Sequence, residues 1–254
     1  MRVKISTEVK FSIGLILIAL LPVVVLFYPL HEEFEYTGNI VPVQELGIDG
    51  SVHFTYVNTG VTEKLLDKLL LLLAEEDIQF YPISSDEYEA YSSYQEDMNV
   101  FKEMTIANAV VQSDPEEADL DAFEKRINEI MAEASQYYGD SLGLMVAIGL
   151  VEEANQWNFS EEKSFTIAGT GTINSDRTIG EVGGIRYKLL AAEQNEVDFF
   201  FVPKNVDEND GYLSNQEEAY KVGDEENLSM MIVPVSNLDE AISFLKNVQE
   251  FNLN

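Results

Sequence analysis

A serine and a lysine have the surroundings that a hydrolytic site needs. Ser141 follows Gly139 and Asp140 and precedes an apolar run, Leu142 to Val151, that predicts a buried helix opened by the serine. A residue at a helix start lies near unpaired backbone N–H groups, which can hold the oxyanion of an acyl transfer. On the serine alone, an ordinary helix N-cap at Asp140 or Ser141 is the simpler interpretation.

Lys188 favours the interpretation of Ser141 as a catalytic nucleophile over that of an ordinary N-cap. It lies in a predicted helix from Ile185 to Gln194. The residues three and four positions away are small or apolar and none is acidic: Gly184, Ile185, Ala191 and Ala192. If that face packs inward, desolvation lowers the pKa of the lysine and makes its neutral amine available as a base. The alternative is a lysine that buries its stem and keeps its ammonium in water. A lysine base for a serine nucleophile needs no histidine.

Five stretches, in order, carry a resemblance to a known family. They are Gly139 to Met145, Ile167 to Ile173, Val182 to Ala192, Phe200 to Asn205 and Ile232 to Leu245. Together they resemble the proteolytic domain of Lon-type serine peptidases, most closely the membrane-anchored bacterial type that carries a PDZ module. The specific element is glycine-glycine-x-x-x-lysine-x-x-alanine-alanine. The resemblance implies that Ser141 is the nucleophile, that Lys188 is its general base, that the substrate is a peptide or protein, and that no cofactor is needed.

The chain departs from this family at two places. The usual Gly-Pro-Ser-Ala-Gly is Gly-Asp-Ser-Leu-Gly here; archaeal relatives also have Asp at the position of Asp140, whereas Leu142 replaces a small residue. The segment between Ser113 and Ser141 is too short for a PDZ module, and residues 114–138 are predicted to be helical instead. The sequence has no Gly-x-x-x-x-Gly-Lys-Ser/Thr loop, so the predicted hydrolysis is independent of ATP.

Composition excludes several other kinds of function. The 254 residues carry a formal charge of −31, and a surface that negative repels nucleic acid. With no cysteine and only His31 and His53, cysteine zinc sites, thiol catalysis and a histidine-rich metal site are excluded; His53 is interpreted as a structural or surface residue. Gly169-Thr170-Gly171 is a weak match to a dinucleotide-binding loop, because Asn174 replaces the third glycine and no helix is predicted there.

An uncharged segment near the N-terminus predicts attachment to a membrane. Phe11 to Leu30 is about long enough to span a bilayer as a helix. It ends without a small-residue cleavage motif, which favours a retained anchor over a cleaved signal peptide. The basic residues that precede it predict a cytoplasmic N-terminus. The predicted organisation is a cytoplasmic tail (1–10), an anchor (11–30), an irregular stalk (31–50) and an extracytoplasmic Lon-like domain (51–254).

Alternating strands and helices predict an α/β (α+β) fold. The predicted strands are Ser51 to Val57, ending at Asn58-Thr59-Gly60, then Ile78 to Ile83, Lys163 to Ile173, Asp198 to Pro203 and Met230 to Val235. The predicted helices, besides those above, are Thr62 to Glu76, Asp86 to Val111, Glu117 to Tyr137, and Leu238 to Val248 capped by Asn237. Asn205 to Leu228 is predicted to be a polar connection. The inward faces are assigned to Met98, Phe101, Met104 and Ala107, and to Leu120, Phe123, Ile127 and Ile130.

Two functions agree with these features. The first is a membrane-anchored Ser/Lys endopeptidase that cleaves exported peptides or proteins. The second is a catalytically inactive Lon-like ectodomain that binds a partner at the cell surface. The retained pair Ser141 and Lys188 favours the enzyme, whereas the altered serine loop and the missing PDZ module favour the binding module. Self-association into a homo-oligomer follows only by analogy with the rings of Lon-like domains.

Overall fold

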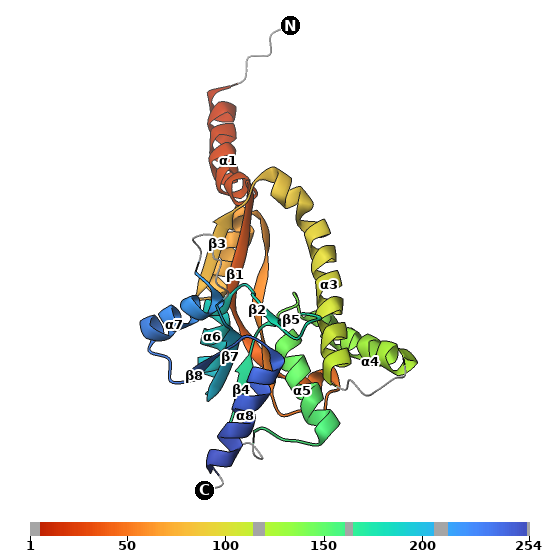
Figure 1. Ribbon diagram of the computed structural model, residues 1–254. Coiled ribbons are helices and arrows are strands. Elements are labelled where there is room, and N and C mark those ends of the chain that lie inside the picture. Colours follow the sequence, from red (N-terminus) through yellow and green to blue (C-terminus); the bar gives the residue numbers. More distant parts are fainter. Residues whose placement is uncertain (1–5, 114–119, 161–164, 206–212, 253–254) are drawn as a thin grey trace. The chain divides into compact units, whose positions relative to one another are not determined.

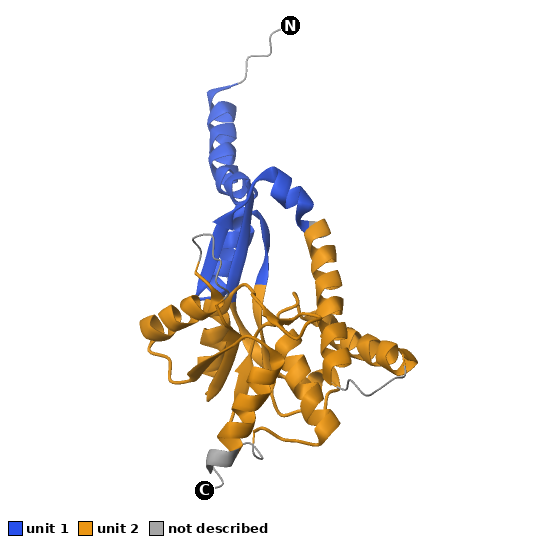
Figure 2. Ribbon diagram, viewed as in Figure 1, with its two compact units in different colours: residues 1–36, 59–91 blue, residues 37–58, 92–254 orange. Residues whose placement is uncertain are grey.

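The computed structural model describes residues 6–113, 120–160, 165–205 and 213–252 (Figure 1). The chain divides into two compact units. Unit 1 comprises Met1–Tyr36 and Thr59–Tyr91, and unit 2 comprises Thr37–Asn58 and Ser92–Asn254 (Figure 2). The fold is mixed α/β, which confirms the predicted class.

A six-stranded mixed sheet has the strand order β3-β1-β2-β4-β7-β8. Its strands are β1 (Pro29–Pro42), β2 (His53–Lys64), β3 (Ile78–Pro82), β4 (Ile167–Gly169), β7 (Phe199–Pro203) and β8 (Met231–Val235). β1 and β3 are antiparallel, whereas β2, β4, β7 and β8 pair in parallel. A separate antiparallel pair is formed by β5 (Thr172–Ile173) and β6 (Ile179–Gly180). The strand predicted from Lys163 to Ile173 is thus divided between β4 and β5, and its first two residues lie outside the described part.

The helices are α1 (Thr7–Leu26), α2 (Leu65–Ala74), α3 (Ser85–Ser113), α4 (Leu120–Glu133), α5 (Gly143–Asn155), α6 (Ile185–Gln194), α7 (Asn215–Glu226) and α8 (Leu238–Asn252). Two 3₁₀ turns are η1 (Val43–Leu46) and η2 (Ala134–Gln136). The bounds of α6 are those predicted, and the Asn237 side chain accepts a hydrogen bond from Glu240 N at 2.9 Å, as expected of the cap of α8. The predicted polar connection from Asn205 to Leu228 contains α7, which begins with a capping box at Ser214.

Strand β7 separates two hydrophobic clusters in unit 2. Phe201 belongs to the larger cluster together with much of α5 and α8, and Phe200 belongs to the smaller one with α6 and α7. Successive side chains of a strand point to opposite faces of the sheet, so one strand supplies both cores. Helix α5 is buried from Gly143 through Glu152, as its uninterrupted apolar sequence predicted.

The prediction of an irregular stalk at 31–50 was wrong. Most of this stretch is β1 and η1, and Val41, Val43, Leu46 and Ile48 are buried in the core of unit 2. Three glutamates near the start of β1, Glu32, Glu33 and Glu35, are typical of a solvated segment, although the strand pairs with β3 there.

Two neighbouring boundaries also differ from the prediction. The apolar helix begins at Thr7 and ends at Leu26 rather than at Leu30, because Pro29 begins β1. Strand β2 does not stop at Asn58-Thr59-Gly60 but continues to Lys64. Gly60 serves packing instead of a turn, since a Cβ there would lie 2.7 Å from Cζ of Phe34.

The inward faces of α3 and α4 were only partly predicted. Phe101 and Met104 are exposed, and the buried positions of α3 are Lys102, Thr105, Ile106, Ala109, Val110 and Gln112. Three of these six are polar, so a search for apolar periodicity missed the face. On α4, Ile130 is fully buried as predicted, whereas Leu120 is 78% exposed.

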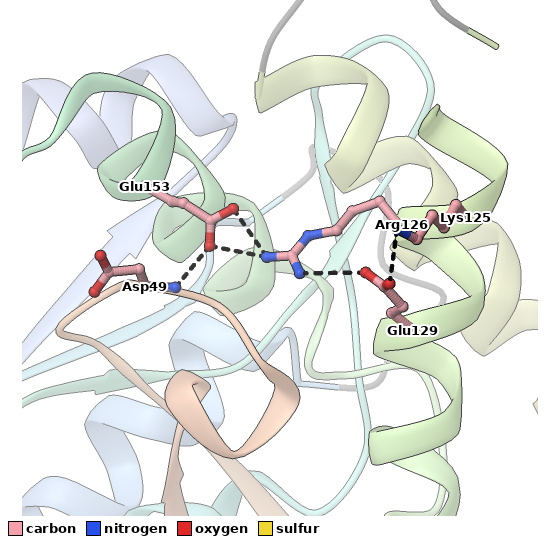
Figure 3. Close-up of polar contacts among 5 residues, drawn as sticks. All are labelled: Asp49, Lys125, Arg126, Glu129 and Glu153. Carbon is pink, nitrogen blue, oxygen red and sulfur yellow. Dashed lines mark hydrogen bonds and ion pairs between the residues drawn. The ribbon is translucent and has the colours of Figure 1, made fainter. Parts of the chain in front are cut away.

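The segment that stands at the expected place of a PDZ module is helical in its described part and belongs to unit 2. Arg126 of α4 donates hydrogen bonds to both carboxylate oxygens of Glu153 on α5, at 2.9 and 2.8 Å (Figure 3). Glu153 also accepts a hydrogen bond from Asp49 N at 2.7 Å. These bonds join α4, α5 and the loop after η1.

A pH dependence of stability is expected from the neighbouring Glu152. Its carboxylate is fully buried and accepts hydrogen bonds from Ser51 N and Phe159 N at 2.7 Å each, and burial raises its pKa although these bonds lower it in part. A carboxyl whose pKa is raised on folding contributes stability that is fully present below its unfolded pKa and is lost as pH rises through the folded value. Urea unfolding of the detergent-solubilised chain should therefore show the parent losing stability relative to Glu152→Gln as pH rises from about 4 to 8.

The matched control for this measurement is Asp176→Asn. Hydrogen bonds from Thr178 lower the pKa of Asp176, so its contribution is fully present above about pH 4 and is lost only below it; between about pH 4 and 8 the difference in stability between parent and Asp176→Asn should therefore stay nearly constant. Equal slopes for the two variants would contradict the role assigned to Glu152.

Candidate functional site

Ser141 lies in a half-buried turn between η2 and α5, not at the helix cap. The helix begins at Gly143, and its N-cap is Leu142, which makes no side-chain capping bond. The prediction that Ser141 opens the helix is therefore wrong by two residues, and the N-cap interpretation is wrong as well. The turn is entered through Gly139, whose φ of +83° suits a residue without a Cβ.

The backbone of this turn is held by the loop after β4. Gly171 N donates to Ser141 O at 2.9 Å, and Leu144 N donates to Gly171 O at 2.8 Å. Gly143 N donates a hydrogen bond to Asp140 O at 3.2 Å. The N–H groups of Ser141 and Leu142 make no hydrogen bond to other described residues. If the site binds an oxyanion, these two are the available donors, in place of the first helical N–H groups.

Lys188 comes into the same neighbourhood from α6. Its side chain is 2% exposed, so the interpretation of a lysine with its ammonium in water is wrong. Lys188 Nζ donates to Thr170 Oγ1 at 3.0 Å, and Thr170 Oγ1 donates to Ser141 O at 3.2 Å. One threonine hydroxyl thus links Lys188 to the backbone carbonyl of Ser141.

Close packing sets the position of α6. Its N-cap, Gly184, has φ +69°, and a Cβ there would lie 2.7 Å from Cγ2 of Val57 on β2. Lys188 N then donates to Gly184 O at 3.1 Å, in the first turn of the helix. The second glycine of the sequence motif, Gly184, therefore allows the helix that carries the lysine to approach the sheet closely.

Two carboxyl groups from other elements lie within electrostatic range of Lys188. Burial raises the pKa of Asp140, and the positive charge of Lys188 lowers it in part. The same two effects act on Glu218 of α7. Helical spacing identifies only the neighbours of Lys188 on its own helix, so it could predict neither of these carboxyl groups. These carboxylates favour the charged ammonium, whereas burial of the lysine disfavours it.

Two further site residues were missed. Thr170 was predicted only to belong to a glycine-bearing loop. A hydroxyl side chain between two glycines, directly after a strand, is the sequence feature that could have identified it as a site residue. Lys102 of α3 is 2% exposed and donates to Ala134 O at 3.3 Å and to Tyr137 O, in the segment that leads to Ser141. Burial lowers the pKa of Lys102.

The weaker sequence signals have structural explanations. Gly169-Thr170-Gly171 leads into β5 rather than into a helix, which is not the arrangement of a dinucleotide-binding loop. His53 has its Nδ1 at 3.2 Å from Ile167 O, and burial lowers its pKa. Leu142 is 2% exposed and packs in the main core. In the part of the chain that the structure describes, no group of three or more acidic or histidine side chains is placed to hold a metal ion.

Comparisons with known proteins add no relative. No protein-family model matches the chain, and no curated protein is significantly similar to it. A functional assignment therefore depends on the sequence motifs and on the geometry around Ser141.

Proposed function

We propose that this protein is a membrane-anchored, ATP-independent serine endopeptidase of the Lon type that cleaves exported peptides or proteins. The observation that carries the proposal is the hydrogen-bonded connection from buried Lys188 through Thr170 to the backbone of Ser141. A buried lysine beside a serine on a turn, with backbone N–H groups available, supplies a base, a nucleophile and oxyanion donors.

In the proposed reaction, Ser141 Oγ forms a bond to the substrate carbonyl carbon while its proton passes to the neutral Nζ of Lys188. The carbonyl electron pair moves to the oxygen, which accepts hydrogen bonds from the N–H groups of Ser141 and Leu142. The oxyanion then collapses, the peptide C–N bond breaks, and Lys188 returns the proton to the leaving amine. Water, deprotonated by the same lysine, hydrolyses the ester. Thr170 positions Nζ throughout.

One observation favours the second function, a binding module without catalysis. Asp140 and Glu218 both favour the protonated lysine, and a protonated lysine cannot take the serine proton. A peptidase needs burial of Lys188 to outweigh these two charges.

The proposal is tested with a fluorophosphonate probe that reacts with activated serines. We expect mass spectrometry of the purified full chain to find one adduct, on Ser141, and we expect Ser141→Ala to abolish it. Ser135→Ala is the matched control, because Ser135 is an exposed serine of η2 in the same part of the chain. Labelling that survives in Ser141→Ala would contradict the role proposed for Ser141, because another serine would then be the activated one. Complete absence of labelling in the parent would argue for the binding module.

The membrane part of the proposal concerns topology. Helix α1 has a mean hydropathy of 2.6 and none of its residues is buried, so it is long and apolar enough to span a bilayer. We propose that it does so once, with the N-terminus in the cytoplasm and the remainder outside.

Because the chain has no cysteine, single cysteines report this topology directly. A membrane-impermeant maleimide should label Ser135→Cys in intact cells stripped of any outer barrier, and should label Ser6→Cys only after permeabilisation. The reverse pattern, or a mature N-terminus near His31, would contradict the proposed anchor.

A further inference from the structure

Helix α2 of unit 1 exposes an unusually apolar surface. Its sequence is LLDKLLLLLA, and none of its residues is buried. Four leucines are exposed: Leu69 (39%), Leu70 (56%), Leu72 (50%) and Leu73 (85%). At 100° per residue these four positions lie within one side of the helix, which we call the leucine face. A contiguous exposed apolar face of this kind marks an interaction site.

The start of α2 is bonded to the end of the membrane helix. Leu65 N donates to Tyr28 O at 3.1 Å, two residues after α1 ends at Leu26, and α1 and α2 are in contact within unit 1. Phe27 and Tyr28 are 54% and 66% exposed. Aromatic residues at the end of a spanning helix are typical of the level where lipid headgroups begin. With α1 spanning the bilayer as proposed, α2 begins at the depth where α1 leaves it.

The polar side of α2 is bound to the strands of unit 1. Lys68 Nζ lies 2.6 Å from a carboxylate oxygen of Glu32 on β1 and 4.6 Å from the ring centroid of Phe80 on β3. On the helical wheel, Lys68 is about 40° from Leu72 but about 140° from Leu73 and about 160° from Leu70. The contact to the strands thus leaves the part of the leucine face formed by Leu70 and Leu73 directed elsewhere.

We propose that the leucine face lies in the outer part of the same bilayer that α1 spans. Ten residues are too few to cross a membrane, but a short apolar helix can lie along the interface with its leucines among the acyl chains. Glu75, Glu76 and Asp77 follow the helix, so attraction to anionic headgroups does not drive the insertion. The consequence is a second attachment that holds unit 1 against the membrane and fixes its orientation there.

The test uses the full chain, one copy per lipid nanodisc, with an environment-sensitive fluorophore on Leu73→Cys. We expect blue-shifted emission, at least twofold quenching by lipids that carry a nitroxide near the headgroup end of the acyl chain, and little quenching by aqueous iodide. Leu120→Cys on α4 is the matched control: Leu120 is also a highly exposed leucine, and its helix is rich in charge. Its label should respond to iodide only.

Three results would overturn the inference. The first is a label at position 73 that iodide quenches and lipid nitroxides do not. The second is a label that iodide quenches in single-copy discs but does not quench when two copies share a larger disc. That result would assign the leucine face to contact with a second chain. The third is insertion only in anionic lipids. Leu70→Cys provides an independent position if Leu73→Cys does not fold. The inference rests on the proposed membrane anchor α1 but not on the proposed peptidase activity: labelling of Ser141 by the fluorophosphonate is a separate readout, so a failure of that activity does not affect this result.

Discussion

Lys188→Arg should abolish peptide hydrolysis nearly as completely as Ser141→Ala, with a loss of about four orders of magnitude or more in kcat, the loss typical for removing a member of such a catalytic pair. Arginine keeps the positive charge beside Asp140 and Glu218, but guanidinium stays protonated and cannot act as a base. The measurement is steady-state cleavage of a fluorogenic peptide by the full chain in detergent.

A matched variant separates chemistry from folding. Lys102→Arg changes another buried lysine of unit 2, which bonds only to backbone carbonyls among the described contacts. It tests the effect of fitting a guanidinium in a buried site without removing the proposed base. We expect Lys102→Arg to retain measurable cleavage wherever its thermal unfolding remains cooperative. If Lys188→Arg cleaves the peptide as fast as the parent does, the proposed Ser/Lys mechanism is wrong.

The pH dependence has a definite sign. Lys188 must lose its proton before Ser141 attacks, so the rate should rise with pH. Asp140→Asn removes a carboxylate that favours the ammonium, and the rising limb of the profile should move to lower pH. Glu218→Gln should act in the same direction. A binding module would show no hydrolysis in any variant and would keep its partner affinity in all of them.

The contrast between Lys188 and its partners shows what sequence could predict. The small and apolar neighbours of Lys188 on α6 made burial one of two alternatives, because contacts within a helix follow from spacing alone, but spacing could not choose between burial and an ammonium in water. Thr170, Asp140 and Glu218 come from a loop, a turn and another helix. Their approach depends on how β4 and β7 place α6 beside the serine turn, which no local pattern contains.

The errors in the fold have a related cause. The apolar pattern located α5, α6 and β7 because most of their buried residues are apolar, although Glu152 and Lys188 are buried too. It failed on α3, where Lys102 and Thr105 are buried by virtue of hydrogen bonds to distant backbone groups. The partners of a buried polar residue must be known before its burial can be predicted.

Gly143→Ala should both destabilise unit 2 and reduce hydrolysis. A Cβ on this first residue of α5 would overlap Thr105 Oγ1 and lie 3.1 Å from Ile173 N. Thr105 Oγ1 cannot easily move, because it accepts a hydrogen bond from Ile173 N at 2.8 Å. Overpacking of this kind costs about 1–3 kcal/mol. Since Ser141 is two residues away, a displacement of about 1 Å should also lower kcat/KM about 100-fold.

A double-mutant cycle identifies the cause of that loss. Thr105→Ala removes the overlapping oxygen but leaves Ile173 N–H unpaired, at a cost of about 1–3 kcal/mol. The combination of Gly143→Ala with Thr105→Ala should therefore be less destabilised than the sum of the single changes, whereas Thr105→Ser keeps the oxygen and should give no such relief. Gly183→Ala is the control, because no atom lies within 4 Å of a Cβ there and its stability should change by less than about 0.5 kcal/mol. Strict additivity in the alanine cycle would mean that the contact between Gly143 and Thr105 does not position the serine turn.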